Sequence, residues 1–361
     1  MDLPLLRELC EASGPPGAED RVRDIVRARL AATADRVDDL AMGCIDGVRE
    51  PAGDPAGRLM LAAHMDEIGL MVTHVDDRGY VKFIPLGGWD ARTLVGQRVL
   101  IHGREDVLGI VGTTPVHLLD EAARSKAPKM EDLTIDLGLP AERAQELVRK
   151  GDVATRVRDL AELGELVTGK ALDDRVGVYV MLEGLRTAGP SQMEVHATAT
   201  AQEEVGLRGA RTAAHRIAPD IAVAIDTCPA DDGPGTPKKG PSTRLGEGAA
   251  IRVMDASAIG HRGLVDLLIA LAEERDIPHQ LHVSNKGGTD TASLQLSGRG
   301  SIAGCISIPT RYVHTSVEAC HPDDVDAAVA LTAALIEQAV RPPSATPPPP
   351  RPAGPGPYAT T

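Results

Sequence analysis

The chain has 361 residues, 42% of them hydrophobic, which is enough for about two or three domains with a sizeable core. Its formal net charge of −14 argues against nucleic acid as a partner, because the phosphates of a nucleic acid would be repelled. Aromatic residues make up only 2% of the chain, so it has few side chains on which bases or sugars could stack.

Cysteine usage and the distribution of apolar residues predict a cytoplasmic protein. The five cysteines are odd in number and lack CxxC spacing, which favours a reducing compartment. The N-terminal segment carries acidic and polar residues where a signal peptide needs a basic start and an apolar run. No segment approaches the roughly 18 uninterrupted apolar residues of a membrane span. We therefore expect a soluble protein without membrane partners.

The N-terminal part of the chain predicts a helix and then a buried strand. Residues 18–32 place four apolar side chains on one helical face. Residues 58–64 form a short apolar run after Gly57, which is typical of a buried strand. Residues 70–118 are rich in Val, Gly and Arg and contain strand-like pieces, and a helical stretch follows at 140–150. We interpret residues 70–163 as a β-rich domain inserted into the main one.

From Lys170 onward, helical and strand patterns alternate. The predicted elements are a helix at about 175–187, strands at 193–201 and 220–226, a helix around 264–271, strands at 279–284 and 301–308, and a helix at about 322–339. Such alternation predicts an α/β fold, a mixed-sheet α/β/α sandwich formed by residues 1–69 and 164–340. Residues 341–361 hold nine of the 27 prolines and predict a disordered tail.

The first candidate site residues are His64 and Asp66, in the motif AAHMDE at the end of a predicted strand. The Asp66 carboxylate can accept the second ring N–H of His64 and so fix its tautomer. An ordinary strand-end turn is the alternative.

A second acidic motif opens a predicted helix and contains Asp173, Asp174 and Arg175. Asp173 there is either a bridging carboxylate, its backbone held by its two neighbours, or one of a pair of acids that cap the helix.

A pair of adjacent acids, Glu203 and Glu204, follows another apolar strand. Neighbouring side chains on extended backbone diverge, so one carboxylate can bind metal while the other takes a proton from metal-bound water. A solvated acidic loop is the alternative. Asp226 ends the apolar run IAVAID, where an acid is costly unless it is paired or binds a cation. His314 follows IPTRYV at a further predicted strand end.

A glycine-rich loop precedes His314 and contains Gly288, Thr289 and Asp290. It is either a simple turn or a loop that faces the substrate. GxSxG, P-loop and GxGxxG motifs are absent, so the signatures of serine hydrolases, kinases and dinucleotide-binding enzymes are missing.

Together the motifs predict a site for two divalent cations. Two neutral histidines and three carboxylates supply −3 against +4, and a bridging hydroxide would close the balance. In order and spacing, the motifs closely resemble the co-catalytic metallo-aminopeptidases of family M42, the tetrahedral aminopeptidases, some of which carry old labels as endoglucanases. The resemblance covers about residues 3–340. It is carried by the blocks ELCEASGPPGAEDRVR, AAHMDE, PLGGWDARTLVGQRV, GKALDDRVG, TAQEEVGLRGA, AIDT, KGGTDTAS and IPTRYVHTSVE.

The resemblance implies five metal ligands. Asp173 bridges both ions, His64 and Asp226 complete one site, and Glu204 and His314 complete the other. The metals of the family are zinc or cobalt, and imidazole and carboxylate ligands agree with either.

The resemblance also implies the catalytic roles and the assembly. Glu203 is the general base and then the general acid, and Asp66 orients His64. Members of the family assemble as dodecameric tetrahedral shells through the inserted domain, so we expect a homo-oligomer and a role for residues 70–163 in dimerisation.

The resulting hypothesis is a dinuclear aminopeptidase that hydrolyses N-terminal residues from short peptides through a metal-bridged hydroxide, with Glu203 as base. One alternative is a related amide hydrolase with a non-peptide substrate. A glycosidase, the second alternative, needs no histidine-rich dinuclear site and usually offers aromatic platforms, whereas this chain has a single Trp89. A metal-loaded scaffold is the third, and an unligated base beside two metals argues against it.

Overall fold

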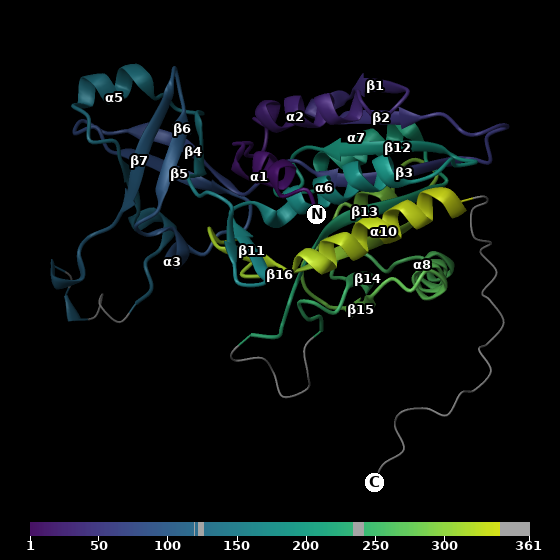
Figure 1. Ribbon diagram of the computed structural model, residues 1–361. Helices are drawn as coiled ribbons and strands as arrows, with labels where there is room; N and C mark the ends of the chain where they lie inside the picture. Colours follow the sequence, from purple (N-terminus) through teal and green to yellow (C-terminus); the bar gives the residue numbers. More distant parts are fainter. Residues whose placement is uncertain (119, 122–125, 234–241, 340–361) are drawn as a thin grey trace, which may run out of the picture.

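The computed structural model describes residues 1–118, 120–121, 126–233 and 242–339. The tail predicted at 341–361 lies outside these residues. Within them, the chain forms a large mixed sheet between helical layers and a small, separate β-barrel beside it (Figure 1). The predicted fold class, an α/β/α sandwich with an inserted β-rich domain, is confirmed. None of the described helices is both long and apolar enough to cross a membrane.

The large sheet contains eleven described strands. Along its main path the strands are β1 (Arg36–Asp39), β2 (Ile45–Arg49), β12 (Glu194–Thr200), β3 (Arg58–His64), β13 (Ile221–Pro229), β16 (Ile302–Arg311), β17 (Glu318–Cys320), β11 (Leu166–Gly169) and β10 (Ala161–Leu163). Off this path, β14 (Ala249–Met254) pairs with β16, and β15 (His279–Val283) pairs with β14. The four central strands β12, β3, β13 and β16 run parallel, and most outer pairs are antiparallel.

The central strands are apolar because both of their faces are covered. Every residue of β3 after Arg58 is buried, which explains why its sequence is a continuous apolar run rather than an alternating one. The predicted strand at 58–64 is confirmed.

Strand β13 is longer than predicted. The prediction that Asp226 ends this strand is wrong, since β13 continues to Pro229 in parallel register with β16.

Two helical layers of unequal size cover the sheet. On one face the helices are α1 (Leu3–Glu11), α2 (Asp20–Leu30), α6 (Leu172–Thr187), α8 (Arg262–Glu274) and α10 (Pro322–Gln338). On the other face lie α7 (Arg208–Ile217) and α9 (Thr291–Gln295). Helix α6 is buried nearly all round because it lies between the sheet, α1 and α10.

The barrel has a hydrophobic core of its own. Its strands close in the order β4 (Gly69–Val75), β5 (Val81–Leu86), β8 (Thr134–Asp136), β7 (Asp106–Gly112), β6 (Arg98–His102) and β9 (Val153–Arg156). Helix α5 (Ala141–Leu147) packs on it, and α3 (Ala91–Leu94) follows β5. The chain enters the barrel five residues after His64, and after β9 it returns to the large sheet at β10.

Candidate metal centre

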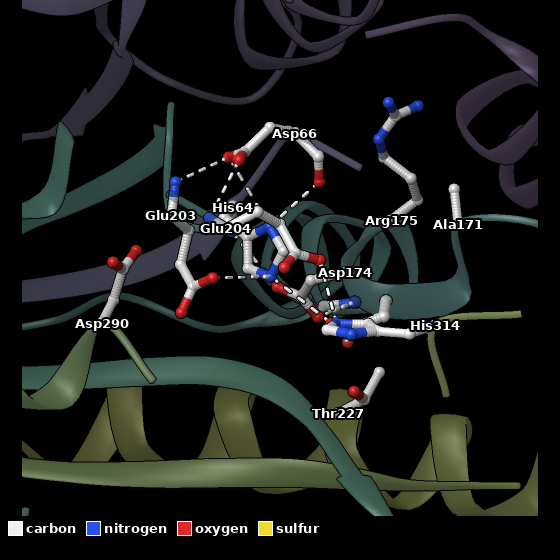
Figure 2. A network of polar contacts seen from close by, with 12 residues as sticks. His64, Asp66, Ala171, Asp174, Arg175, Glu203, Glu204, Thr227, Asp290 and His314 are labelled. Carbon is white, nitrogen blue, oxygen red and sulfur yellow. Dashed lines mark hydrogen bonds and ion pairs between the residues drawn. The ribbon is translucent and has the colours of Figure 1, made fainter. Parts of the chain in front are cut away.

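The parallel strands bring three of the predicted ligand segments to one edge of the sheet. His64 is the last residue of β3, Glu203 and Glu204 follow β12, and Asp226 lies in β13. Because these strands run in the same direction, their carboxyl ends meet at the same edge, which is the usual place for a site in such a sheet. Figure 2 shows the acidic side chains gathered around the two imidazoles at this edge.

The remaining two ligand candidates reach this edge from other elements. Asp173 lies in the first turn of α6, and His314 lies between β16 and β17. The Asp173 carboxylate is placed between the two imidazoles, with Oδ1 3.4 Å from His64 Nε2 and Oδ2 3.4 Å from His314 Nε2. On the other side, His314 Nε2 is 3.1 Å from Glu204 Oε1. One carboxylate therefore faces both histidines.

Two groups of side chains among the described residues could each hold a metal ion. The first is His64, Asp174 and Asp226, and the second is Asp173, Glu204 and His314, each with its ligand atoms within 4.8 Å of one another. The first group contains Asp174, whereas the resemblance implies that Asp173 binds the metal together with His64 and Asp226.

The Asp174 carboxylate already has backbone partners. It accepts hydrogen bonds from the His64 N–H at 3.2 Å and from the Gly177 N–H at 3.1 Å. The second contact caps the first turn of α6, as the capping alternative predicts for this pair of acids. Asp173 has no such contact through its side chain, which leaves its carboxylate free for a cation.

The electrostatics of the site reflect buried negative charge. Burial and the Asp173 charge raise the pKa of Asp226 to about 8. Burial would lower the pKa of His314, but the Asp173 and Glu204 carboxylates raise it to about 11. Burial also holds the pKa of Glu203 well above its usual range. Without cations, such a cluster has to take up protons, so it is an environment that favours cations.

The donor atoms present fit divalent cations. Asp173 Oδ1 and Glu204 Oε1 are buried and have no hydrogen-bond partner. The imidazole nitrogens lie close to these oxygens, but not in the geometry of a hydrogen bond. A buried carboxylate oxygen left in this way is costly unless a cation occupies its lone pair. Neutral imidazole and carboxylate are also the ligand types that zinc and similar metals take in proteins.

The contacts of Asp66 differ from the predicted one, in which its carboxylate accepts the second ring N–H of His64. His64 Nδ1 lies 3.0 Å from the main-chain carbonyl oxygen of Asp66, whereas the carboxylate oxygen is 3.7 Å away. The Asp66 carboxylate instead accepts the N–H groups of Glu203 at 2.9 Å and of Glu204 at 3.0 Å (Figure 2). Its side chain therefore fixes the acidic pair, and its backbone fixes His64.

The predicted substrate loop faces the cavity only in part. The site opens into a cavity of about 570 Å³, and Gly288 lines it. Thr289 and Asp290 are buried and are not among the residues that line the cavity, so a role for them in facing the substrate stays a prediction. Asp290 Oδ2 accepts a hydrogen bond from the Thr200 hydroxyl at 2.6 Å, which ties this loop to the end of β12.

Several residues of the site are missing from the sequence-based prediction. Arg252 and His282 line the cavity from β14 and β15, and Gly88 lines it from the barrel. Strand β14 was not predicted, so nothing pointed to Arg252. Glu318 is buried and accepts hydrogen bonds from the N–H groups of Asp173 and His314. Glu318 follows the candidate ligand His314 by four residues, but its partners are backbone N–H groups, which no residue pattern marks.

Known proteins share this fold over nearly its whole length. The sequence model of the M42 glutamyl aminopeptidase family matches residues 45–331. The lysyl aminopeptidase of Pyrococcus furiosus is 33% identical over 350 residues, which cover 94% of this chain and 97% of that protein.

Two solved structures are similar as well. The aminopeptidase APDkam598 from the archaeon Desulfurococcus kamchatkensis is 40% identical, with a TM-score of 0.89, and the match covers 93% of this chain and 94% of that one. The Pyrococcus horikoshii TET1 peptidase, which can assemble into a tetrahedron or a large octahedral shell, is 32% identical with a TM-score of 0.83, over 93% and 99% of the two chains. The chain therefore belongs to the M42 family of metal-dependent aminopeptidases, and it is a hydrolase that acts on peptides.

Proposed function

We propose that this chain removes N-terminal residues from short peptides with two divalent cations bound in one site. The observation that carries the proposal is the Asp173 carboxylate, which faces His64 and His314 with one oxygen each at 3.4 Å. A carboxylate in this position would help to hold both of the cations that a dinuclear hydrolase uses.

The remaining ligands divide between the two positions. His64 and Asp226 lie on one side of Asp173, and Glu204 and His314 lie on the other. Zinc and cobalt suit this set of imidazole and carboxylate donors. When bound, the two cations would polarise the scissile carbonyl and make a water molecule more acidic.

Glu203 is the residue that we assign to proton transfer. Its carboxylate belongs to neither ligand group, and its Oε2 lies 3.9 Å from His64 Nε2, at the edge of the site. The backbone of Glu203 is fixed by the hydrogen bond from its N–H to Asp66. The side chain can therefore take a proton from the attacking water and pass it to the amine that leaves.

The family relationship supports cleavage of the peptide bond that follows the N-terminal residue. The Pyrococcus furiosus relative is a lysyl aminopeptidase, and the Desulfurococcus structure is also an aminopeptidase. The cavity of about 570 Å³ has room for one side chain and a short stretch of peptide.

A panel of aminoacyl-p-nitroanilides tests this function. The protein would be stripped with a chelator, its metal content measured, and hydrolysis of the Leu, Glu, Asp, Lys and Ala substrates followed with and without added Co²⁺ or Zn²⁺. We expect no activity in the stripped protein and restored cleavage with about two ions per chain.

Each other outcome would change the proposal. If no substrate of the panel is hydrolysed although two ions are bound, the substrate is a different amide. If no substrate is hydrolysed and no ion is bound, the five proposed metal ligands are ruled out. Activity that survives stripping would contradict a metal-dependent reaction.

A further inference from the structure

The proposed base Glu203 leaves the end of β12 from a short segment, residues 202–204, whose backbone departs from that of the strand. Gln202 has a φ of 57°, in the left-handed region that side chains such as glutamine rarely adopt. This conformation is unfavourable by itself, and it persists only where surrounding groups hold the backbone in it. The contacts that hold residues 202–204 therefore also set the direction in which the Glu203 side chain leaves the backbone.

Three consecutive backbone N–H groups of this segment each donate to a carboxylate. The N–H groups of Glu203 and Glu204 donate to Asp66 at 2.9 and 3.0 Å (Figure 2). The N–H of Gln202 donates to Glu19 Oε1 at 3.1 Å. Two acids from different parts of the chain, one just after β3 and one just before α2, thus hold the segment together.

The side chain of Glu19 serves this segment and its own turn rather than the helix that it precedes. Glu19 is the N-cap residue of α2, yet its side chain accepts no hydrogen bond from that helix. Its Oε1 accepts the N–H of Gly17 at 2.8 Å in addition to that of Gln202. The residue is only 5% exposed, and a buried carboxylate is costly unless such donors balance it. The carboxylate therefore links the turn before α2 to the end of β12.

Resting on the proposed function, we propose that Glu19 is a positioning residue for the base: its carboxylate holds the Gln202 N–H, and with it the left-handed turn from which the Glu203 side chain reaches the site. Glu19 contacts none of the candidate ligands in this role and acts through the backbone alone. A small displacement of a reacting group can lower the rate by up to about 100-fold, so the effect of Glu19 falls on kcat.

Three substitutions at Glu19 separate the hydrogen bond from the charge. Glu19→Gln keeps a carbonyl oxygen at the same distance from the backbone, and we expect kcat to fall by less than about threefold. Glu19→Asp keeps the charge but draws the oxygen back by one CH₂ group, and Glu19→Met has no oxygen. Both of these should lower kcat by about 10- to 100-fold.

The measurement uses metal-loaded, full-length protein and the aminoacyl-p-nitroanilide that the wild type cleaves fastest. KM and a content of about two ions per chain should stay as in the wild type for all three variants, because the candidate ligands are unchanged.

Glu337→Met is the matched control. Glu337 Oε1 accepts the N–H of Gly189 at 2.7 Å, and Gly189 precedes β12 whereas Gln202 follows it. The substitution therefore also removes a partly buried carboxylate that accepts a backbone N–H, but at the other end of the same strand. Its kcat should stay at the wild-type value.

A combination with Glu203→Gln tests whether Glu19 acts through the base. In that background, Glu19→Met should lower the residual kcat by less than about twofold, because the group that it would displace has already been removed. A residue that only stabilises the fold would lower kcat by the same factor in both backgrounds.

The proposal is overturned if Glu19→Met keeps the wild-type kcat, if it loses a bound ion, or if it lowers kcat equally with and without Glu203. It is also overturned if Glu19→Asp is more active than Glu19→Gln, since the charge would then matter more than the hydrogen bond. Should Glu19→Met not fold, as judged by circular dichroism, Glu19→Asp takes its place in each comparison. The proposed function fails separately, when wild-type protein binds no metal or cleaves no aminoacyl substrate.

Discussion

Glu203 and Glu204 are adjacent in the chain, yet their carboxylates have different surroundings. Glu204 lies beside His314 in a ligand group, whereas Glu203 belongs to neither group. Both backbones are fixed by the two oxygens of Asp66, so the divergence of the side chains is held in one orientation. A ligand and a proton-transfer residue can thus be placed side by side.

This arrangement predicts opposite results for two conservative substitutions. Glu203→Gln removes the group that accepts the proton, and we expect kcat to fall by about 10²- to 10⁴-fold while metal binding is retained. Glu204→Gln removes a charged donor from one position, and we expect it to lose one of the bound ions. Steady-state kinetics and metal analysis of both variants, beside wild type, give the comparison. Full activity in Glu203→Gln would show that another group transfers the proton.

The identities of the candidate ligands could be predicted from the sequence, but their contacts could not. An acid or histidine at the end of an apolar run, such as His64, is conspicuous because burial makes it costly. The contacts of Asp66 depend on the path of the backbone after β12, which side-chain spacing does not encode. Glu318 was not predicted because its contacts also depend on the path of the backbone: its partners are backbone N–H groups, which every sequence contains.

At the scale of elements, helices α6 and α10 pack at a point where no side chain fits between them. A Cβ on Gly184 of α6 would lie 2.6 Å from Thr332 Cγ2 and 2.9 Å from Thr332 Cβ on α10. The glycine weakens the helix, and the close packing of the two helices offsets this cost.

Gly184→Ala should therefore destabilise the protein although alanine is the better helix former. The gain in helix propensity is about 1 kcal/mol, whereas overpacking typically costs about 1–3 kcal/mol. We expect a net loss of up to about 2 kcal/mol, seen as a lower midpoint of urea unfolding.

The matched control for this substitution is Gly112→Ala at the end of β7. A Cβ there has no neighbour within 4 Å, so the midpoint should stay where it is or rise slightly. An unchanged or higher midpoint in Gly184→Ala would mean that α6 and α10 can separate without cost.

Elements are predicted best from the sequence where a single requirement, such as burial of both faces of a strand, determines the pattern of residues. Strand β3 was predicted at its observed bounds because a strand covered on both faces is a continuous apolar run. Helices α6, α8 and α10 were predicted from the sequence, whereas the shorter α7 and α9 were not. Strands β1 and β14 were not predicted. Three of the four residues of β1 are charged, and none of the four is buried. Strand β14 carries the buried Arg252, which donates a hydrogen bond to Asp255 at 3.2 Å.

At the scale of the whole molecule, the barrel has two surfaces with different tasks. Its Gly87–Gly88 turn lies against the metal centre, and its outer face is exposed. Along β7 the side chains alternate, with Val107 and Val111 in the barrel core and Leu108 and Ile110 each 53% exposed. Two leucine-sized side chains on the outer face of one strand are unusual for a surface that only meets water.

We therefore expect the chain to form a homo-oligomer that uses this outer face. The related TET1 peptidase of Pyrococcus horikoshii assembles into closed shells. The described strands of the barrel close into a ring, so we expect association to use side chains on its faces. Light scattering coupled to size exclusion should give a mass that is a multiple of 37.9 kDa.

The variant Leu108→Asp/Ile110→Asp tests the assignment of this face. Burying two carboxylates in a contact is strongly unfavourable, so the variant should elute as a smaller species. Since both side chains point outward, the apoprotein should keep its circular dichroism spectrum and its unfolding midpoint, and the metal centre should still bind cobalt. A variant that assembles like the wild type would place the contact elsewhere on the chain, and a monomeric wild type would show that this chain does not assemble as its relative does.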